Sequence, residues 1–107
     1  MNVAVKAGGR EFNSELAQTF LQHMAGLMIG GKRNILFILE KERIFGIHSF
    51  FVFFPFDAIY ISEKKIVVDV IRQVPPFTAY AANRRPAKYL LELVEKNGLK
   101  VGDRVEW

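Results

Sequence analysis

Apolar residues in this chain occur in short runs separated by polar or glycine-containing stretches. A nearly unbroken apolar run extends from Ile47 to Phe56, where phenylalanines occupy both odd and even positions before Asp57. In a strand over residues 49–56 these side chains would point to both faces of a sheet, so both faces would need cover. We therefore expect a central strand there, with Pro55 at a bend or bulge.

The rest of the pattern also favours strands. Residues 3–6 alternate apolar and polar before Gly8-Gly9, which predicts a hairpin into residues 10–12. Three more apolar or β-branched segments extend the aromatic strand into a predicted meander of consecutive strands. These segments are residues 34–40, 57–61 and 66–70.

Two segments favour helices. Thr19 with Gln22 three residues later is a capping-box arrangement, which predicts a short helix over residues 20–25. Residues 87–97 have an amphipathic spacing that ends at a glycine and predict a second helix, with a strand over residues 88–93 as the alternative.

The remaining segment, residues 75–86, begins with Pro75-Pro76 and predicts a long surface loop of the kind that often carries function. A Gly102-Asp103 turn then leads to a last short strand. The sequence thus predicts one domain over residues 1–107, mostly β within the α+β class. We expect a compact antiparallel β-barrel or sandwich-like sheet with one or two short helices packed on it.

Composition excludes several classes of site. The chain has 107 residues and no cysteine, which excludes disulfides, thiolate zinc sites and cysteine nucleophiles and fits a reducing cytoplasm. The amino terminus lacks the apolar core of a signal peptide. A membrane span over residues 44–61 is disfavoured because His48, Pro55 and Asp57 would lie in the hydrocarbon. We expect a cytoplasmic protein with no metal or cofactor.

The net charge of +4 raises the question of nucleic-acid binding. Basic pairs such as Arg84-Arg85 alternate along the chain with acidic residues. The aromatic residues lie in apolar runs rather than beside the cations, where they would stack on bases. The pattern therefore argues against a nucleic-acid partner and favours a small molecule or a protein.

Several landmarks together resemble a known family. They are residues 17–28 with the Gly26-Leu27-Met28 triplet, Leu36-Phe37, residues 48–57 ending in proline, an apolar residue and aspartate, and Val101-Gly102-Asp103. In their order and spacing the chain is similar to the domain of unknown function 192 family over most of its length. The resemblance implies a compact β-rich fold with short helices packed against it, found in prokaryotic proteins, and no assigned biochemical activity.

The chain departs from the family pattern at two places. His23 stands where the family usually has an arginine ahead of the Gly-Leu-Met triplet, so no role of that guanidinium transfers to this chain. After Leu93 the chain is shorter and lacks the usual glycine-containing turn. This leaves residues 88–94 open to either helix or strand.

His48 and Asp57 are the residues best suited to acid–base chemistry. A histidine at a strand end more often bonds the backbone, and Asp57 follows Pro55 closely enough to cap a bend. No second histidine or cysteine stands at ligand spacing from His48, and no serine has the surroundings of a nucleophile. A structural role is therefore favoured for both residues.

The sequence alone assigns no activity. We expect a non-catalytic binding or accessory module whose rim would take a small anionic or polyhydroxyl ligand, the rim residues being His48, Asp57, Tyr80, Arg84 and Arg85. One alternative is an enzyme of hydrolase or isomerase type that uses His48 with Asp57. Another is an oligomeric protein-interaction module with part of the phenylalanine excess at an interface. Monomer and homodimer both stay open.

Overall fold

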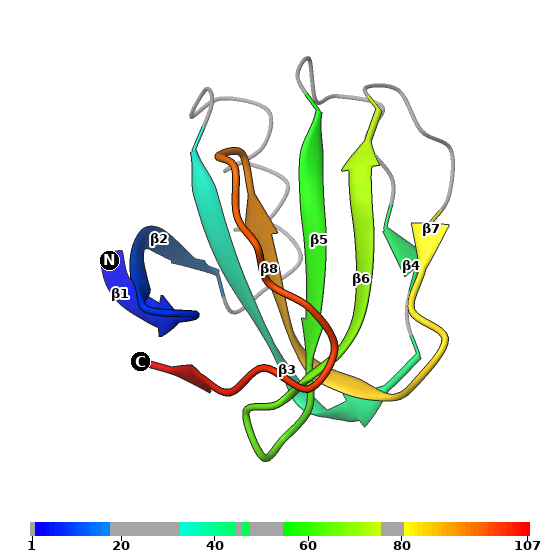
Figure 1. The fold of residues 1–107 in the computed structure, drawn as a ribbon. Coiled ribbons are helices and arrows are strands. Elements are labelled where there is room, and N and C mark those ends of the chain that lie inside the picture. Colours follow the sequence, from blue (N-terminus) through cyan, green and yellow to red (C-terminus); the bar gives the residue numbers. More distant parts are fainter. Residues whose placement is uncertain (1, 18–32, 45, 48–54, 76–80) are drawn as a thin grey trace.

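A computed structural model describes residues 2–17, 33–44, 46–47, 55–75 and 81–107 of the chain. Within these ranges the chain forms strands and turns, and no helix occurs there. Figure 1 shows most of the strands in one curled sheet that makes a half-barrel. The strands are β1 (Asn2–Ala7), β2 (Arg10–Ala17), β3 (Asn34–Arg43), β4 (Gly46–Ile47), β5 (Phe56–Ile61), β6 (Val67–Val74), β7 (Ala81–Ala82), β8 (Ala87–Leu93) and β9 (Val105–Glu106).

The 7-stranded sheet has the order β6-β5-β8-β3-β2-β1-β9, and β4 pairs with β7 in a separate 2-stranded sheet. The prediction of a mostly β fold is confirmed. The neighbours are antiparallel except β2 and β3, which run parallel with Leu16 opposite Leu36. The prediction of an antiparallel sheet is wrong for this pair, because an apolar run does not determine the direction in which its strand pairs.

The predicted hairpin at the amino terminus is confirmed. Strand β1 pairs with β2 from Asn2 opposite Glu15 to Ala7 opposite Arg10. Gly8 and Gly9 have φ values of 59° and 75°. A two-residue turn that matches the twist of its strands needs positive φ at both positions, and glycine adopts such values without steric cost.

The predicted helix over residues 87–97 is wrong, and its alternative is correct. Strand β8 lies inside the sheet, and Tyr89, Leu90 and Leu91 are all buried there. The spacing of the leucines fits an amphipathic helix, but consecutive apolar residues also fit a strand with both faces covered. Pairing with a strand on each side satisfies the β8 backbone and buries both faces at once.

The predicted meander is wrong in its order. Strands lie where the sequence places them near residues 34–40, 57–61 and 66–70, but β8 separates β3 from β5. Leu91 stands opposite both Leu36 of β3 and Ile59 of β5. The aromatic residues 48–54 and the predicted helix over residues 20–25 lie outside the described residues.

The predicted loop over residues 75–86 is also not wholly irregular. It contains β7, whose Ala82 stands opposite Gly46 of β4. Residues 76–80 lie outside the described ranges. The described part of this connection, from Asn83 to Pro86, leads directly into β8.

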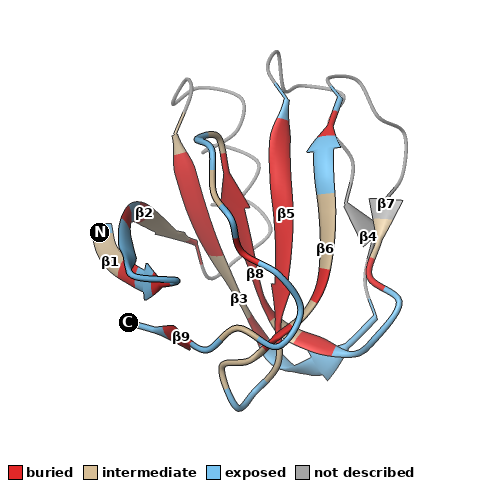
Figure 2. Ribbon diagram, viewed as in Figure 1, coloured by how far each residue is buried: buried red, intermediate tan, exposed pale blue. Residues whose placement is uncertain are grey.

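Both faces of the sheet carry an apolar cluster, and Figure 2 shows β5 buried along its whole length. Successive residues of β5 point to opposite faces, so Ile59 and Ile61 belong to one cluster and Phe56, Ala58 and Tyr60 to the other. The first cluster also contains Val5, Phe12, Leu36, Val67, Leu91, Leu93, Leu99 and Val105. The second also contains Ala17, Ile35, Val74, Ala87 and Leu90.

The carboxyl-terminal segment, residues 94–107, crosses the face that carries the first cluster (Figure 1). Leu99 and Val105 are buried in that cluster. Trp107 packs edge-on against Tyr89 at a ring-centroid distance of 4.7 Å, and Lys65 Nζ lies 4.1 Å from the Trp107 ring centroid. The segment therefore serves as the cover that a half-barrel needs on this side.

The position of β8 can be tested with Leu91→Ala. Leu91 is fully buried in the first cluster, so the substitution should lower the free energy of unfolding by about 2–5 kcal/mol. Val101→Ala is the control, because Val101 is 58% exposed and its loss should change the value by less than about 0.5 kcal/mol. Urea unfolding measures both, and equal effects would contradict an internal β8.

Candidate functional site

Asp57 lies near the start of β5, with its carboxylate buried on the face of the first cluster. Its Oδ1 accepts hydrogen bonds from Gln73 N (2.8 Å) and Gln73 Nε2 (3.3 Å). Gln73 has a positive φ of 51° where the register between β5 and β6 shifts, so Asp57 stabilises a bulge. The carboxylate thus holds β6, rather than the bend at Pro55 that the sequence indicated.

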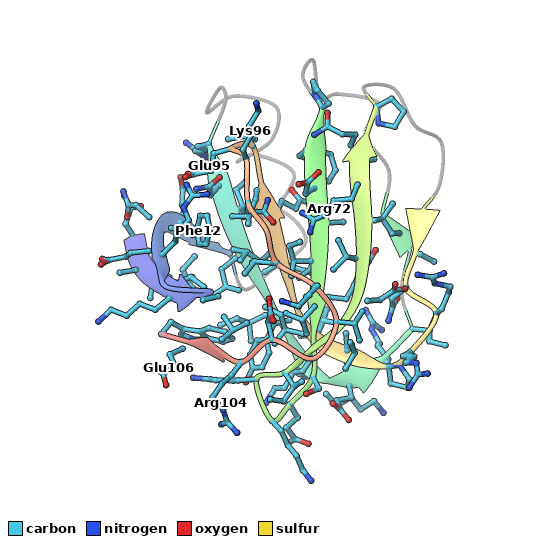
Figure 3. All side chains as sticks on the ribbon, in the orientation of Figure 1. Phe12, Arg72, Glu95, Lys96, Arg104 and Glu106 are labelled. Carbon is cyan, nitrogen blue, oxygen red and sulfur yellow. The ribbon has the colours of Figure 1, made fainter. Side chains whose placement is uncertain are left out.

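Arg72 and Asn97 complete the surroundings of Asp57. Asp57 Oδ2 accepts hydrogen bonds from Arg72 Nη1 and Asn97 Nδ2, both at 3.0 Å. Arg72 Nη1 also donates to Asn97 Oδ1 at 2.7 Å, and Arg72 Nη2 donates to the Leu99 carbonyl. Figure 3 shows Arg72 beside β5 and β6. This network fastens that segment to β5 and β6.

Asp69 and Arg84 form an ion pair of unequal burial. The Asp69 side chain is 2% exposed, whereas that of Arg84 is 81% exposed. Arg84 Nη2 donates to Asp69 Oδ1 at 2.5 Å, and Arg84 Nε donates to Oδ2 at 3.2 Å. The backbone N–H groups of Arg84 and Val70 also donate to this carboxylate, at 2.8 and 2.9 Å. Asp69 therefore fixes both the backbone and the side chain of Arg84.

These contacts lower the pKa of the Asp69 carboxyl from its usual value of 3.8. The largest cause is the pair of side-chain hydrogen bonds from Arg84, which favour the ionised form. Burial acts in the opposite direction and is outweighed, with help from the backbone N–H groups of Arg84 and Val70. Asp69 is therefore ionised at neutral pH despite its burial.

Asn83 also fixes the loop that precedes β8, in which Arg84 lies. Its side chain is buried, and Nδ2 donates to the Arg43 carbonyl at 3.1 Å and to the Arg85 carbonyl at 2.5 Å. Arg43 ends β3 and stands opposite Ala87 at the start of β8. We call Arg43, Arg84 and Arg85 the arginine corner, because all three are exposed on backbone that Asp69 and Asn83 fix.

The structure divides the rim residues predicted from the sequence. Asp57 lies on the face of the first cluster, whereas Asp69 stands opposite Tyr60 and so shares the face of the second. Asp57 and Arg84 are therefore not brought together. Arg84 and Arg85 are neighbours in the loop, and both are exposed. His48 and Tyr80 lie outside the described residues.

Sequence reasoning missed Asp69 and Arg72, whereas Asn83 lies in the loop that the sequence predicted to carry function. Asp69 interrupts a β-branched run in β6, and that interruption is a signal for a buried charge with a partner. The sequence does not say that the partner is Arg84, in another part of the chain. A third buried carboxylate, Glu92, stands opposite Ala58 within β8, and no pattern around it distinguishes it from a surface residue.

Two other features are absent from the described ranges. No group of three or more histidine, cysteine, aspartate or glutamate side chains there is arranged to hold a metal ion. No helix in the described part of the chain has the length and apolar character needed to cross a membrane.

Comparison with known proteins identifies the family. The domain of unknown function 192 family, described as uncharacterised, matches residues 3–107. The chain belongs to this family. An uncharacterised UPF0127 protein of Pyrococcus furiosus is 33% identical over 108 residues, which cover 92% of this chain and 91% of that protein. A second UPF0127 protein, from Pyrococcus abyssi, is 34% identical over 87% of this chain and 84% of its own length.

Two crystal structures share the fold of this family member. One is a protein of Sinorhizobium meliloti described as a candidate transcription regulator, with a TM-score of 0.88, 24% identity, and coverage of 99% of this chain and 93% of that one. The other is a protein of unknown function from Novosphingobium aromaticivorans, with a TM-score of 0.83, 24% identity, and coverage of 99% and 85%. At this identity the likeness establishes the fold alone.

Asp57→Ala should show that Asp57 stabilises the fold. The substitution leaves the Gln73 N–H without its acceptor and removes the carboxylate partner of Arg72, so the free energy of unfolding should fall by about 1–3 kcal/mol. Urea unfolding measures the change, with the exposed Glu11→Ala as control. A loss no larger than that of the control would show that the network contributes nothing to stability.

Asp69→Asn should have an effect that depends on pH. Because folding lowers the pKa of Asp69, its ionised form contributes stability above the usual value of 3.8, and this contribution is lost as pH falls through the lowered pKa. The variant should be less stable than the wild type by about 1–3 kcal/mol at pH 7. Urea unfolding at pH 7, 5 and 3 should show this difference narrowing below pH 4, and a widening difference would contradict the pair.

Proposed function

We propose that this protein is a non-catalytic binding module whose ligand is a small anion, bound at the arginine corner. One observation carries the proposal. Arg84 is 81% exposed, yet its backbone N–H and two of its side-chain nitrogens are held by a buried carboxylate. An exposed arginine usually loses side-chain freedom when it binds, and one that is already fixed loses less.

Local charge also supports an anionic ligand. The arginine corner contributes three exposed arginines, and Arg84 is paired with the Asp69 carboxylate. Glu42, the acidic neighbour of Arg43 in the sequence, accepts a hydrogen bond at its Oε2 from the N–H of Glu63, which lies in the turn between β5 and β6 (2.7 Å). The corner therefore keeps a local excess of positive charge, which favours encounter with anions.

The two alternatives predicted from the sequence receive no support from the described residues. A catalytic role for Asp57 needs a carboxylate that is accessible to a substrate, and that of Asp57 is buried and accepts hydrogen bonds from Arg72, Gln73 and Asn97. The oligomeric alternative stays a prediction.

The test is a titration of the purified protein with inorganic phosphate, and separately with acetate, followed by two-dimensional NMR at constant ionic strength. Saturable shifts should centre on residues 83–88, and Arg84→Ala should weaken binding about tenfold because a charged hydrogen-bonding group is lost. Arg85→Ala should weaken it less, since no described residue fixes the Arg85 side chain.

Arg104→Ala is the matched control, because it removes the same charge from an exposed arginine beside β9 (Figure 3). It should leave the affinity within about twofold of the wild type. Equal losses of anion affinity in Arg84→Ala and Arg104→Ala would show that binding depends only on the net charge of the protein, which would contradict a site at the arginine corner. Absence of saturation by either anion up to about 10 mM would overturn the proposal.

A further inference from the structure

We infer that the ligand of the arginine corner is an oxyanion that presents two oxygens side by side, a carboxylate or a phosphate group, and that Arg84 binds it through the edge between Nη1 and Nη2. Asp69 is the positioning residue that turns this edge to solvent. The inference rests on the proposed function and adds the chemical class of the ligand.

The geometry of the guanidinium carries the inference. Arginine has five N–H donors in one rigid plane. Asp69 engages Nε and Nη2, with Nε to Oδ2 at 3.2 Å and Nη2 to Oδ1 at 2.5 Å, and so occupies the side edge of that plane. The end edge keeps both N–H groups of Nη1 and one of Nη2. No described residue accepts a hydrogen bond from Nη1, and the side chain is 81% exposed.

The end edge matches a particular ligand shape. Two parallel N–H groups in one plane bind two oxygens of a carboxylate or phosphate at once, which adds geometric selectivity to charge attraction. A chloride ion offers one atom and gains little from the second donor. Preference for oxyanions over chloride is therefore the signature of this edge, whereas a diffuse positive surface would favour neither.

Asp69 is well placed to hold the edge in position. Its carboxylate is 2% exposed and also accepts hydrogen bonds from the Val70 and Arg84 backbones, so it cannot turn without breaking both. Because two side-chain hydrogen bonds join the carboxylate to the guanidinium, the fixed carboxylate also fixes the orientation of the guanidinium plane. Without Asp69 the Arg84 side chain would rotate as freely as any exposed arginine.

Charge attraction and positioning predict opposite results for Asp69→Asn. This substitution removes a negative charge beside the site, so attraction alone predicts tighter anion binding. Positioning predicts weaker binding, because the guanidinium loses its fixed orientation. The sign of the change separates the two explanations, and a simple loss of stability does not imitate it if the folded fraction is measured in the same samples.

The experiment titrates phosphate, acetate and chloride at pH 7 and constant ionic strength into the wild type, Arg84→Lys and Asp69→Asn, with Arg104→Lys as the matched control. The wild type should bind at least one oxyanion more tightly than chloride, and the phosphate and acetate titrations show which oxyanion it prefers. Arg84→Lys keeps the charge but loses the planar edge, so it should lose about tenfold in oxyanion affinity and most of the preference over chloride. Asp69→Asn should also bind oxyanions more weakly, and Arg104→Lys should match the wild type.

Each contrary result has a distinct meaning. Full oxyanion binding by Arg84→Lys, with loss in Arg84→Ala, would overturn the two-oxygen inference and leave the proposed function standing. Tighter binding by Asp69→Asn would overturn the positioning role. If Asp69→Asn does not fold, Arg84→Lys still decides the ligand class, because residue 84 has an exposed side chain. The Arg84 Nε–H resonance of the wild type then reports whether the guanidinium is fixed. Failure of every anion to bind the wild type would overturn the proposed function itself.

Discussion

The pairing of β8 with both β3 and β5 is the interaction on which the whole sheet depends. The partners come from distant parts of the chain, since β8 begins at residue 87, β3 at residue 34 and β5 at residue 56. Leu91 meets Leu36 on one side and Ile59 on the other, and all three belong to the same buried cluster. Among the described strands, β5 and β6 connect to β3 and the amino-terminal hairpin within the large sheet through β8. Closing the long loops between these strands costs entropy, and the contacts of β8 with both neighbours offset that cost.

Two buried carboxylates then fix the periphery on opposite faces of the β5–β6 pair. Asp57 fastens the carboxyl-terminal segment over the first cluster, through Arg72 and Asn97. Asp69 fastens the loop before β8 on the other face, through Arg84. Each charge is costly to bury, and each is stabilised by charged or backbone donors that also need a partner. The two carboxylates thus serve different purposes. Asp57 helps to cover the first cluster, whereas Asp69 holds a guanidinium that stays exposed to solvent.

Local patterns predicted much of the local structure, although the spacing of residues 87–97 favoured a helix where β8 lies. Gly8-Gly9 predicted the first hairpin, and the runs near residues 35–39 and 57–61 predicted β3 and β5, because turn chemistry and continuous apolar residues are properties of neighbours in the sequence. The order of the strands was out of reach, since nothing local states that β8 enters between β3 and β5. The same limit applied to the site. Arg84 drew attention as part of a basic pair, but its partner Asp69 lies in a different strand, and only the fold brings the two together.

Among the described strands β6 is the last of the large sheet, and this position bears on why a carboxylate is buried there. An inward-pointing charge and a bulge both discourage another chain from pairing with an exposed edge, and β6 has Asp69 as well as register shifts against β5. Edge protection accounts for a charge at this position, but it needs no particular partner for that charge. It leaves unexplained why Asp69 binds the backbone and the side edge of Arg84 while the guanidinium remains in solvent. A site that presents a fixed arginine accounts both for the hydrogen bonds between Arg84 and Asp69 and for the exposure of the guanidinium. Such a site lies beside a strand whose bulge and buried charge already discourage pairing with another chain.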